Sequence, residues 1–445
     1  MILLKINLPS YAKTALKKLN DGGFEAYAVG GCVRDSILGS EPHDWDITSS
    51  ALPDQVLDVF SDFKTIETGL KHGTVTVMIE HQPIEITTMR RDGEYSDNRH
   101  PDSVEFTSSI EEDLSRRDFT INAMAYSETG GLCDPFHGAQ DIADRTVRCV
   151  GDPDKRFNED ALRIIRALRF SSVLGFPIEG ATAESILKNR QLLNNVASER
   201  IRTELVKLLC GKDVKRILMD FAPVIFTVIP ELEPMYKFPQ KTPYHIYDVW
   251  EHTATAVESI KPDGNLRMTM LLHDLGKPEM HTIDENGIAH FKMHQQASYE
   301  KSLDILKRLR FSNADAEEIS TLVLYHDLRP TGEKKQTLRF ASKYGADTMK
   351  KLYNVFIADA AAQNPVNYED VFNRVKRSEA YLDEAIKESA CLSLKDLKVN
   401  GNDIKALGFE GKKIGEILDC VLEKIIDGEL ENDRQKIIGF VKNNF

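Results

Sequence analysis

Two aspartates near the N-terminus have the spacing of a metal site. In "YAVGGCVRDSILGSEPHDWDIT" (27–48), one tryptophan separates Asp44 from Asp46, so in an extended strand both carboxylates point to the same face. Carboxylate oxygens are the ligands that Mg²⁺ prefers. Glu85, in the strand-like "PIEITTMR", is the candidate for a third catalytic carboxylate, since a two-ion site can activate a hydroxyl and stabilise a leaving pyrophosphate. The alternative is a surface loop whose acids lie together by chance.

Glycines and an arginine precede the aspartates and favour a phosphate ligand. Gly30 and Gly31 permit close approach of the backbone, whose N–H groups suit phosphate oxygens. Arg34 adds a rigid cationic fork for the same oxygens. These residues together with Asp44 and Asp46 form a more specific pattern than two closely spaced aspartates alone.

A second basic cluster lies in "DLSRRDFTINAMAY" (113–126). It places Arg116, Arg117 and Asp118 before an apolar pattern of helical type. Two arginines at a helix start would suit a triphosphate. Asp118 in that position can instead serve only as a helix cap.

A third cluster, "EDALRIIRALRF" (159–170), has the chemistry to select a base. Asp160 and Arg163 stand three residues apart, so on a helix they share a face and offer an acceptor beside a donor. Cytosine and adenine both present an amino donor beside a ring-nitrogen acceptor, whereas uracil and guanine present the reverse, so one pair could accept C and A. The alternative is a solvated ion pair. Arg166 and Arg169 continue the spacing and could hold phosphates or RNA.

The second half of the chain is rich in histidines. "LLHDLGKP" contains an adjacent His-Asp pair, and its order with other histidines is similar to the HD phosphohydrolase superfamily, in which such a pair ligates a metal. Imidazoles and carboxylates without thiolates suit Mn²⁺, Fe²⁺, Ni²⁺ or Mg²⁺ better than a structural zinc. A buried histidine can also be purely structural. The candidate ligands are His252, His273, Asp274, His294, His326 and Asp327.

Composition limits the class of protein. The chain has 445 residues and a formal net charge of −13, which by itself disfavours a polyanionic partner. Residues 154–216 nevertheless carry thirteen Lys and Arg against eight Asp and Glu, a local basic stretch that could contact nucleic acid. Six scattered cysteines without a CxxC pair indicate free thiols in a reducing cytoplasm and no disulfide partner. No apolar run is long enough to cross a membrane.

The distribution of patterns predicts an α+β chain of several domains. Strand-like runs are concentrated in residues 1–110, and helical periodicity dominates from about residue 155. Proline-bearing stretches at 230–245 and 329–335 indicate boundaries. We therefore expect a mixed-sheet head followed by a long all-α remainder.

Together the motifs resemble the class II tRNA nucleotidyltransferases, the CCA-adding enzymes of the polymerase β superfamily. "GGCVRD", "DWD", "RRDFTINAMAY", "EDALRIIRALRF" and "SERIRTEL" match that family's motifs in order and approximate spacing. The resemblance implies a catalytic head (1–145), a helical neck that binds nucleotide and RNA (146–235), an HD-type body (236–335) and a tRNA-binding tail (336–445). It also implies that Mg²⁺ binds Asp44 and Asp46, and that tRNA, CTP and ATP are the partners. The implied nucleotide contacts are Gly31, Arg34 and Arg117, with Asp160 and Arg163 as base template and Arg166 and Arg169 in support.

Several alternatives remain within and outside this family. The polar segment 90–110 has the composition of a mobile loop and is similar to the flexible loop of enzymes that add the terminal A, which argues against CC addition alone. It does not separate full CCA addition from A addition. A poly(A) polymerase shares the head motifs, although "INAMAY" looks more like the CCA branch. A rival of another class is a metal-dependent HD phosphohydrolase whose head only binds RNA.

Overall fold

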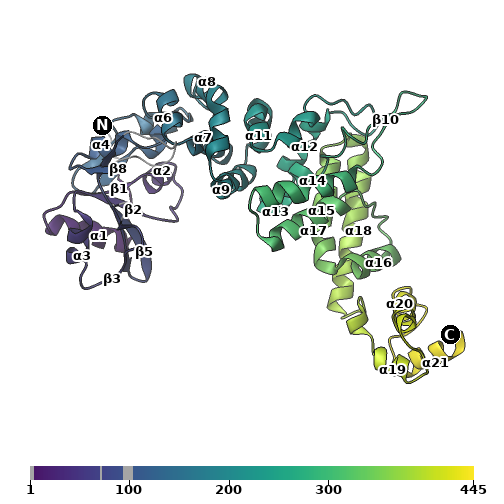
Figure 1. The fold of residues 1–445 in the computed structure, drawn as a ribbon. Helices are drawn as coiled ribbons and strands as arrows, with labels where there is room; N and C mark the ends of the chain where they lie inside the picture. The colour runs from purple at the N-terminus through teal and green to yellow at the C-terminus, as the bar shows by residue number, and fades with distance from the viewer. Residues whose placement is uncertain (1–4, 71–72, 94–103) are drawn as a thin grey trace. The chain divides into compact units, whose positions relative to one another are not determined.

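The chain forms two compact units, which we describe separately. The computed structural model describes residues 5–70, 73–93 and 104–445 (Figure 1). The units are Met1–Pro230 and Glu231–Phe445. The four parts expected from the sequence are thus gathered into two, and the expected boundaries at 145 and 335 fall inside the units.

A mixed seven-stranded sheet organises the first unit. Its strand order is β3-β4-β5-β2-β1-β8-β9, in which β2 and β5 run parallel and the other neighbours run antiparallel. The strands are β1 (Ala26–Val29), β2 (Asp46–Ser49), β3 (Lys64–Ile66), β4 (Thr74–Ile79), β5 (Gln82–Thr88), β8 (Ala125–Ser127) and β9 (Gly131–Cys133). The strands expected within residues 1–110 are confirmed by β1 to β5, and the strand-like "PIEITTMR" lies largely in β5.

The two faces of this sheet differ in character. Helices α1 (Ser10–Asp21) and α3 (Pro53–Val59) contact the face where Ile47 and Ile86 are buried (Figure 1). Alternation along β2 and β5 then directs Asp46 and Glu85 to the opposite face. On that face α4 (Ile110–Ser115) contributes Leu114 to a small apolar core. The apolar layer thus anchors one side of the strands and leaves their acids on the other.

Helices complete the first unit. They are α2 (Gly31–Ile37), α5 (Gly138–Ala143), α6 (Pro153–Glu159), α7 (Leu162–Leu174), α8 (Gly180–Asn189), α9 (Ser198–Leu209), α10 (Val214–Asp220) and α11 (Ala222–Val228). The helix expected after Asp118 is wrong, because a short 3₁₀ turn (Thr120–Asn122) leads into β8 there. Residues 119–127 are all buried. Periodic spacing indicates a helix only when one face is buried and the other is exposed, so the pattern is not informative in this segment.

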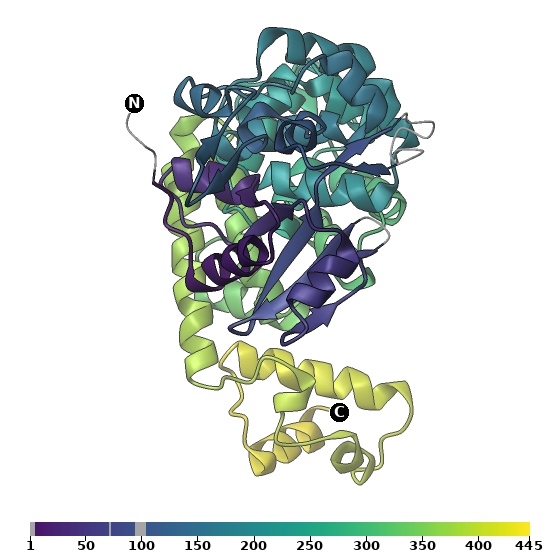
Figure 2. The same ribbon diagram turned by 90° about the vertical axis from the view of Figure 1, so that its left-hand side faces the viewer.

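The second unit is almost entirely helical. It contains α12 (Val249–Ser259), α13 (Gly264–Leu272), α14 (His294–Arg308), α15 (Asn313–Tyr325), α16 (Lys334–Tyr344), α17 (Ala346–Ala361) and α18 (Tyr368–Lys387). A two-stranded ribbon, β10 (Thr282–Ile283) with β11 (Ala289–His290), departs from the expected all-α remainder. Helices α19 (Gly401–Lys405), α20 (Lys412–Ile426) and α21 (Arg434–Asn444) surround their own core beyond the end of α18, in yellow in Figure 2.

Two expectations about the whole chain can be compared with the structure directly. All six cysteines are free thiols. Among the described residues, no helix combines the length and apolarity that crossing a membrane requires.

The packing of α7 against α9 generates a stability prediction at Gly211. A Cβ added there would lie 2.6 Å from the carbonyl carbon of Ser172, whose backbone cannot move without disturbing α7. We expect Gly211→Ala to lower the free energy of unfolding of the first unit by about 1–3 kcal/mol, as overpacking does. Urea denaturation measures this change. Gly180→Ala is the matched control, because no atom lies within 4 Å of its Cβ, and equal midpoints for both variants would contradict the prediction.

Candidate nucleotide-binding and metal sites

The predicted carboxylates meet at the parallel strand pair. Asp46 is the register partner of Glu85, so their side chains share a face. Asp44 precedes β2, and the burial of Trp45 between the two aspartates keeps both outside the core. The pKa of Asp46 is raised to about 6, first because neighbouring atoms reduce its hydration and then because Glu85 and Asp44 repel its charge. A divalent cation would relieve this repulsion, so the donor set fits Mg²⁺.

The turn before α2 brings the backbone next to Arg117. Gly30 has φ of 80°, and a Cβ at this residue would lie 3.0 Å from Nη1 of Arg117. A side chain is therefore disfavoured by both backbone conformation and space. At Gly31 an added Cβ would lie 3.7 Å from Nη2 of Arg34, which is ordinary contact. The structure thus places Gly31, Arg34 and Arg117 around one short turn beside the carboxylates.

A buried aspartate that the sequence reading missed orients the arginine pair. Asp113 is fully buried, and its carboxylate accepts hydrogen bonds from Arg116 (2.7 Å) and from Nη2 of Arg117 (3.3 Å). It also accepts from the Thr48 hydroxyl (3.4 Å) and the backbone N–H of Arg90 (3.3 Å). The arginines thus follow the end of α4, so their expected position at a helix start is wrong. An acid four residues before Arg117 was the available signal.

Arg34 belongs to a chain of charged and polar contacts. Its guanidinium donates to Asp35 (2.8 Å) and to the side-chain oxygen of Asn122 (2.6 Å). Asn122 in turn donates to Asp118 (3.2 Å), whose other oxygen accepts two hydrogen bonds from Arg166 (2.9 and 2.6 Å). Asp118 therefore joins the head to α7. It caps no α-helix.

An aromatic ring lies at the centre of this network. Three guanidinium groups lie over or beside Phe170 at 5.2, 5.4 and 4.8 Å from its centroid, those of Arg34, Arg166 and Arg169 respectively. Glu204 of α9 accepts from Arg169 (3.1 Å) and forms an ion pair with Arg166 (3.5 Å). Phe170 and Glu204 therefore restrict three of the predicted nucleotide contacts to one region, a role the sequence reading did not assign to either residue.

The expected base-selecting pair does not lie on one helix. Asp160 occupies the break between α6 and α7, where its side chain accepts from the N–H of Leu162 (3.1 Å) and pairs with Arg200 (3.0 Å). Arg163 is in α7 with 8% exposure, and it donates to Glu159 (2.8 Å) and to backbone carbonyls. The extended backbone of Asp160, at φ −137° and ψ 102°, explains why the helical face expected for the pair is wrong.

The polar segment between β5 and α4 is described only at its ends. Strands β6 (Arg90–Asp92) and β7 (Val104–Phe106) pair antiparallel. Of the segment 90–110 that is similar to a flexible loop, residues 94–103 lie outside the described residues.

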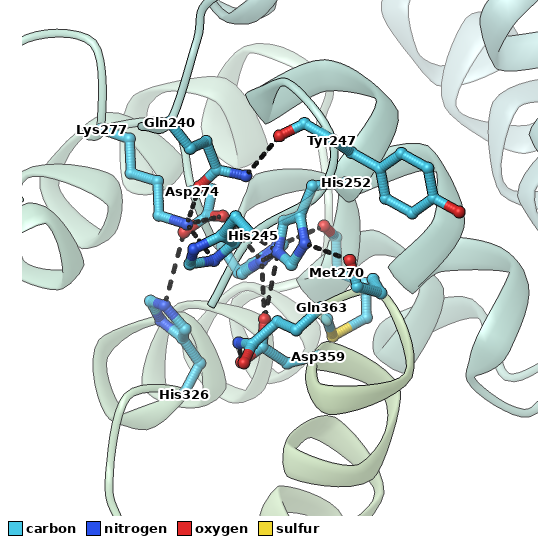
Figure 3. Close-up of polar contacts among 12 residues, drawn as sticks. Gln240, His245, Tyr247, His252, Met270, Asp274, Lys277, His326, Asp359 and Gln363 are labelled. Atoms are coloured by element: carbon cyan, nitrogen blue, oxygen red, sulfur yellow. Dashed lines mark hydrogen bonds and ion pairs between the residues drawn. The ribbon is translucent and has the colours of Figure 1, made fainter. Parts of the chain in front are cut away.

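In the second unit the predicted histidines form one buried cluster, which we call the histidine cluster. It comprises His252 of α12, His273 and Asp274 after α13, His294 at the start of α14, and His326 after α15. Asp274 lies between two groups of potential ligands, one with His252 and His273 and the other with His294 and His326. Figure 3 shows His252 of α12, Asp274 after α13 and His326 after α15 converging from different segments of the chain. These donors fit a divalent transition metal.

One predicted ligand lies outside the histidine cluster, and an unpredicted one lies inside it. Asp327 pairs with Arg329 and belongs to neither group of ligands. Asp359 of α17 approaches instead, with Oδ1 3.1 Å from Nε2 of His252 (Figure 3). The signal in the sequence was a lone acid in the apolar helical run "VFIADAA", which is ambiguous without a contact map.

The pKa values of two histidines in the histidine cluster are shifted in opposite directions. Burial lowers the pKa of His326 to about 3, with help from the neighbouring His294 and His273. At His273 burial acts in the same direction, but Asp274 and Asp359 outweigh it and raise the pKa to about 10. His273 therefore binds a proton more tightly than His326 does.

Comparison with known families matches most of the chain in three parts. Residues 26–148 match the family described as the poly A polymerase head domain. Residues 175–224 match a family described as "Probable RNA and SrmB- binding site of polymerase A", and residues 281–441 match tRNA nucleotidyltransferase domain 2.

Full-length relatives are CCA-adding enzymes. The chain is 33% identical to that of Enterococcus faecalis over 97% of this chain and 95% of the relative, and 34% identical to that of Geobacillus thermodenitrificans over 96% and 95%. A match to the Ligilactobacillus salivarius enzyme is 50% identical but spans only 48% of this chain and 54% of that enzyme. The Bacillus stearothermophilus CCA-adding enzyme in complex with CTP superposes with a TM-score of 0.72 at 30% identity, covering 97% and 96% of the two chains. The chain therefore belongs to the CCA-adding enzyme family of tRNA nucleotidyltransferases.

Proposed function

We propose that this chain adds or repairs the 3′-terminal CCA of tRNA from CTP and ATP and releases pyrophosphate. The observation that carries the proposal is the position of Asp46 and Glu85 beside Gly31 and Arg34 of one turn, which the guanidinium of Arg117 adjoins. Relatives over nearly the full length are CCA-adding enzymes, which favours this activity over a poly(A) polymerase or an enzyme that adds A alone. A tRNA substrate and free thiols agree with action in the cytoplasm.

In the head, carboxylates would bind the metal and arginines would bind the triphosphate. Asp44 and Asp46, with Glu85 beside them, would hold Mg²⁺, which when bound neutralises phosphate charge and makes the tRNA hydroxyl a better nucleophile. Arg34 and Arg117 are cationic donors positioned by Asn122 and Asp113, so they can orient the triphosphate. Fixed orientation lowers the entropic part of the barrier.

This proposal predicts loss of addition when either aspartate is changed. Asp44→Ala or Asp46→Ala should reduce incorporation of labelled CTP and ATP by more than 100-fold, on the order expected for loss of a catalytic metal site, while tRNA binding changes little. The assay offers tRNAs that end before C, after C and after CC. Asp54→Ala, on the exposed surface of α3, is the matched control. Near-normal addition by Asp44→Ala or Asp46→Ala in Mg²⁺ would overturn the metal assignment. Unlimited A addition by the parent would identify a poly(A) polymerase.

We further propose that Asp160 and Arg163 read the base, with Arg166 and Arg169 in support. The donor–acceptor chemistry of the pair supports this role, although Asp160 now contacts Arg200 and Arg163 contacts Glu159. A base would have to exchange with these internal partners. Such exchange keeps the side chains of Asp160 and Arg163 themselves hydrogen-bonded, which a wrong base would fail to do.

Asp160→Asn therefore tests base selection with little change in volume. It places an amide where the carboxylate stood, so discrimination of CTP against UTP should fall roughly 5- to 150-fold, the equivalent of 1–3 kcal/mol. Competitive incorporation of the two nucleotides measures the ratio. Lys155→Ala, exposed on α6, should leave the ratio unchanged. Equal discrimination by Asp160→Asn and the parent would show that this residue does not read the base.

A second function is favoured by the histidine cluster. We propose that it is a metal-dependent phosphohydrolase site with Mn²⁺, Ni²⁺, Fe²⁺ or Mg²⁺ as cofactor. The cluster adjoins a cavity of about 500 Å³ that is lined by His294, His326 and Asp274 together with Lys277 and Arg329. A cavity with both metal ligands and cations suits a phosphate ester.

The two proposed activities should be separable by mutation. His273→Ala with Asp274→Ala should remove hydrolysis of p-nitrophenyl phosphate and of a 2′,3′-cyclic nucleotide, because both metal donors and charge are lost. Nucleotide addition should stay within about twofold, since the head has its own ligands. Asp44→Ala is the reciprocal control and should retain hydrolysis. Loss of addition in a double variant with a normal melting curve would show coupling, and a parent inactive with every metal would contradict the hydrolase proposal.

A further inference from the structure

Asp113 is a charged side chain of the head that a nucleotide cannot reach. It lies in α4 and is fully buried. Burial by itself raises the pKa of Asp113, but the charges of Arg116 and Arg117 outweigh it and hold the pKa below its usual value. The carboxylate is therefore ionised. Any effect it has on the reaction must act through the groups that contact it.

Two groups hold this carboxylate against the face of the sheet that carries Asp46. The hydroxyl of Thr48 lies 3.4 Å from Oδ2 of Asp113, and the backbone N–H of Arg90 donates to Oδ1 at 3.3 Å. Thr48 follows Asp46 by two residues in β2, so both side chains point to the same face. Asp113 is therefore anchored to the strand that begins with Asp46.

The same carboxylate holds the two arginines that follow α4. Its Oδ1 accepts from Nε and Nη2 of Arg116, at 3.0 and 2.7 Å. Its Oδ2 accepts from Nη2 of Arg117 at 3.3 Å. Hydrogen bonds between ionised groups are stronger than neutral ones, and two of them on one oxygen leave the guanidinium of Arg116 little freedom.

The backbone of Arg116 contacts the proposed base-reading arginine of α7. Nη2 of Arg163 donates to the carbonyl of Arg116 at 3.0 Å. The same guanidinium donates to Glu159 at 2.8 Å and to the carbonyl of Arg156 at 3.2 Å. Glu159 and Arg156 belong to α6, whereas Arg116 follows α4 and is held by Asp113. The orientation of Arg163 therefore depends on the position of Arg116.

We propose that Asp113 is a positioning residue that couples triphosphate binding to base selection, through Arg117 on one side and through Arg116 and Arg163 on the other. This inference rests on the proposed function, in which Arg117 and Arg163 hold the nucleotide. Side chains that bind a ligand directly select well only when neighbouring contacts fix them. A donor that is free to move can also follow the edge of a wrong base.

The alternative is a purely structural role, because neutralising one partner of a buried ion pair is costly anywhere in a protein. Asp141 of α5 provides a matched control. It is 6% exposed, and it accepts from the hydroxyl of Thr120 (2.6 Å) and from Nε of Arg148 (3.2 Å), so it has the same kinds of partner as Asp113. Its contacts continue through Arg148 to Glu179, the residue before α8.

Asp113→Asn removes the charge with little change in volume. With a tRNA that ends before C, the ratio of kcat/KM for CTP to that for UTP should fall roughly fivefold or more, the lower end of coupling between linked sites. Inhibition by inorganic tripolyphosphate, which has no base, should weaken by a comparable factor because Arg117 is no longer held. A smaller fraction of folded protein lowers both kcat/KM values equally, so it cancels in the ratio.

Asp141→Asn should lower the melting temperature without changing the nucleotide ratio or the inhibition by tripolyphosphate. Equal loss of selection in folded Asp113→Asn and Asp141→Asn would overturn the positioning role and leave a structural one. An unchanged ratio in folded Asp113→Asn would overturn it as well.

A double-mutant cycle with Arg116→Met tests the route. Because Asp113 acts on base selection through Arg116, Asp113→Asn should change the ratio by less than about twofold when Arg116→Met is already present. Additive losses would contradict this route. If Asp113→Asn does not fold, Arg116→Met alone remains decisive, since it removes the contact and keeps the carboxylate. An unchanged ratio in folded Arg116→Met would then overturn the coupling.

The outcomes separate this inference from the proposed function. Relaxed selection in Asp160→Asn with an unchanged ratio in Asp113→Asn would overturn the coupling and leave base reading intact. The reverse would contradict base reading by Asp160 and support the route through Arg163. A parent that adds no nucleotide would contradict the proposed function. Calorimetric titration of tripolyphosphate would still test the coupling in that case, since equal affinities of the parent and Asp113→Asn would overturn it.

Discussion

The parallel pairing of β2 with β5 places Asp46 directly beside Glu85, and the head depends on this repulsive contact. Strand pairing and the apolar layer under Ile47 and Ile86 stabilise the arrangement, since acids alone would move apart. The pKa of Asp46 is raised first by its reduced hydration and then by the charges of Glu85 and Asp44. A fold that holds like charges together is prepared for a cation, which makes the sheet itself part of the proposed chemistry.

Cationic side chains around this site are held by partners that leave little freedom. Asp113, Asp118 and Glu204 each accept from an arginine while buried or nearly so. A buried carboxylate paired in this way is costly to separate from its partner, so the arginines are oriented before any ligand arrives. Phe170 adds a flat apolar surface against which Arg34 and Arg169 lie. The negative charges are thus as important to a phosphate site as the positive ones.

In the second unit, imidazoles are likewise oriented by internal partners before a ligand binds. Backbone carbonyls contact Nδ1 of each ring, and α12, α14 and the segments after α13 and α15 bring the four rings to Asp274. The two units meet different chemical demands, because the head offers oxygen ligands and the histidine cluster offers mainly nitrogen ligands. A single family assignment therefore describes the chain without accounting for every site in it.

The sequence by itself determined the α+β class, the strands that carry Glu85 and the glycine turn, most long helices, and the types of residue in both sites. Local spacing was sufficient there, because alternation and helical periodicity report which face is buried. Only the tertiary structure decided that Asp160 lies in a break before α7, that Arg117 follows α4, and that Asp359 replaces Asp327 beside His252. Each of these depends on contacts between segments far apart in the chain or on a local departure from helical backbone. Periodicity cannot encode either, because it describes one element at a time and carries no information about which elements will meet.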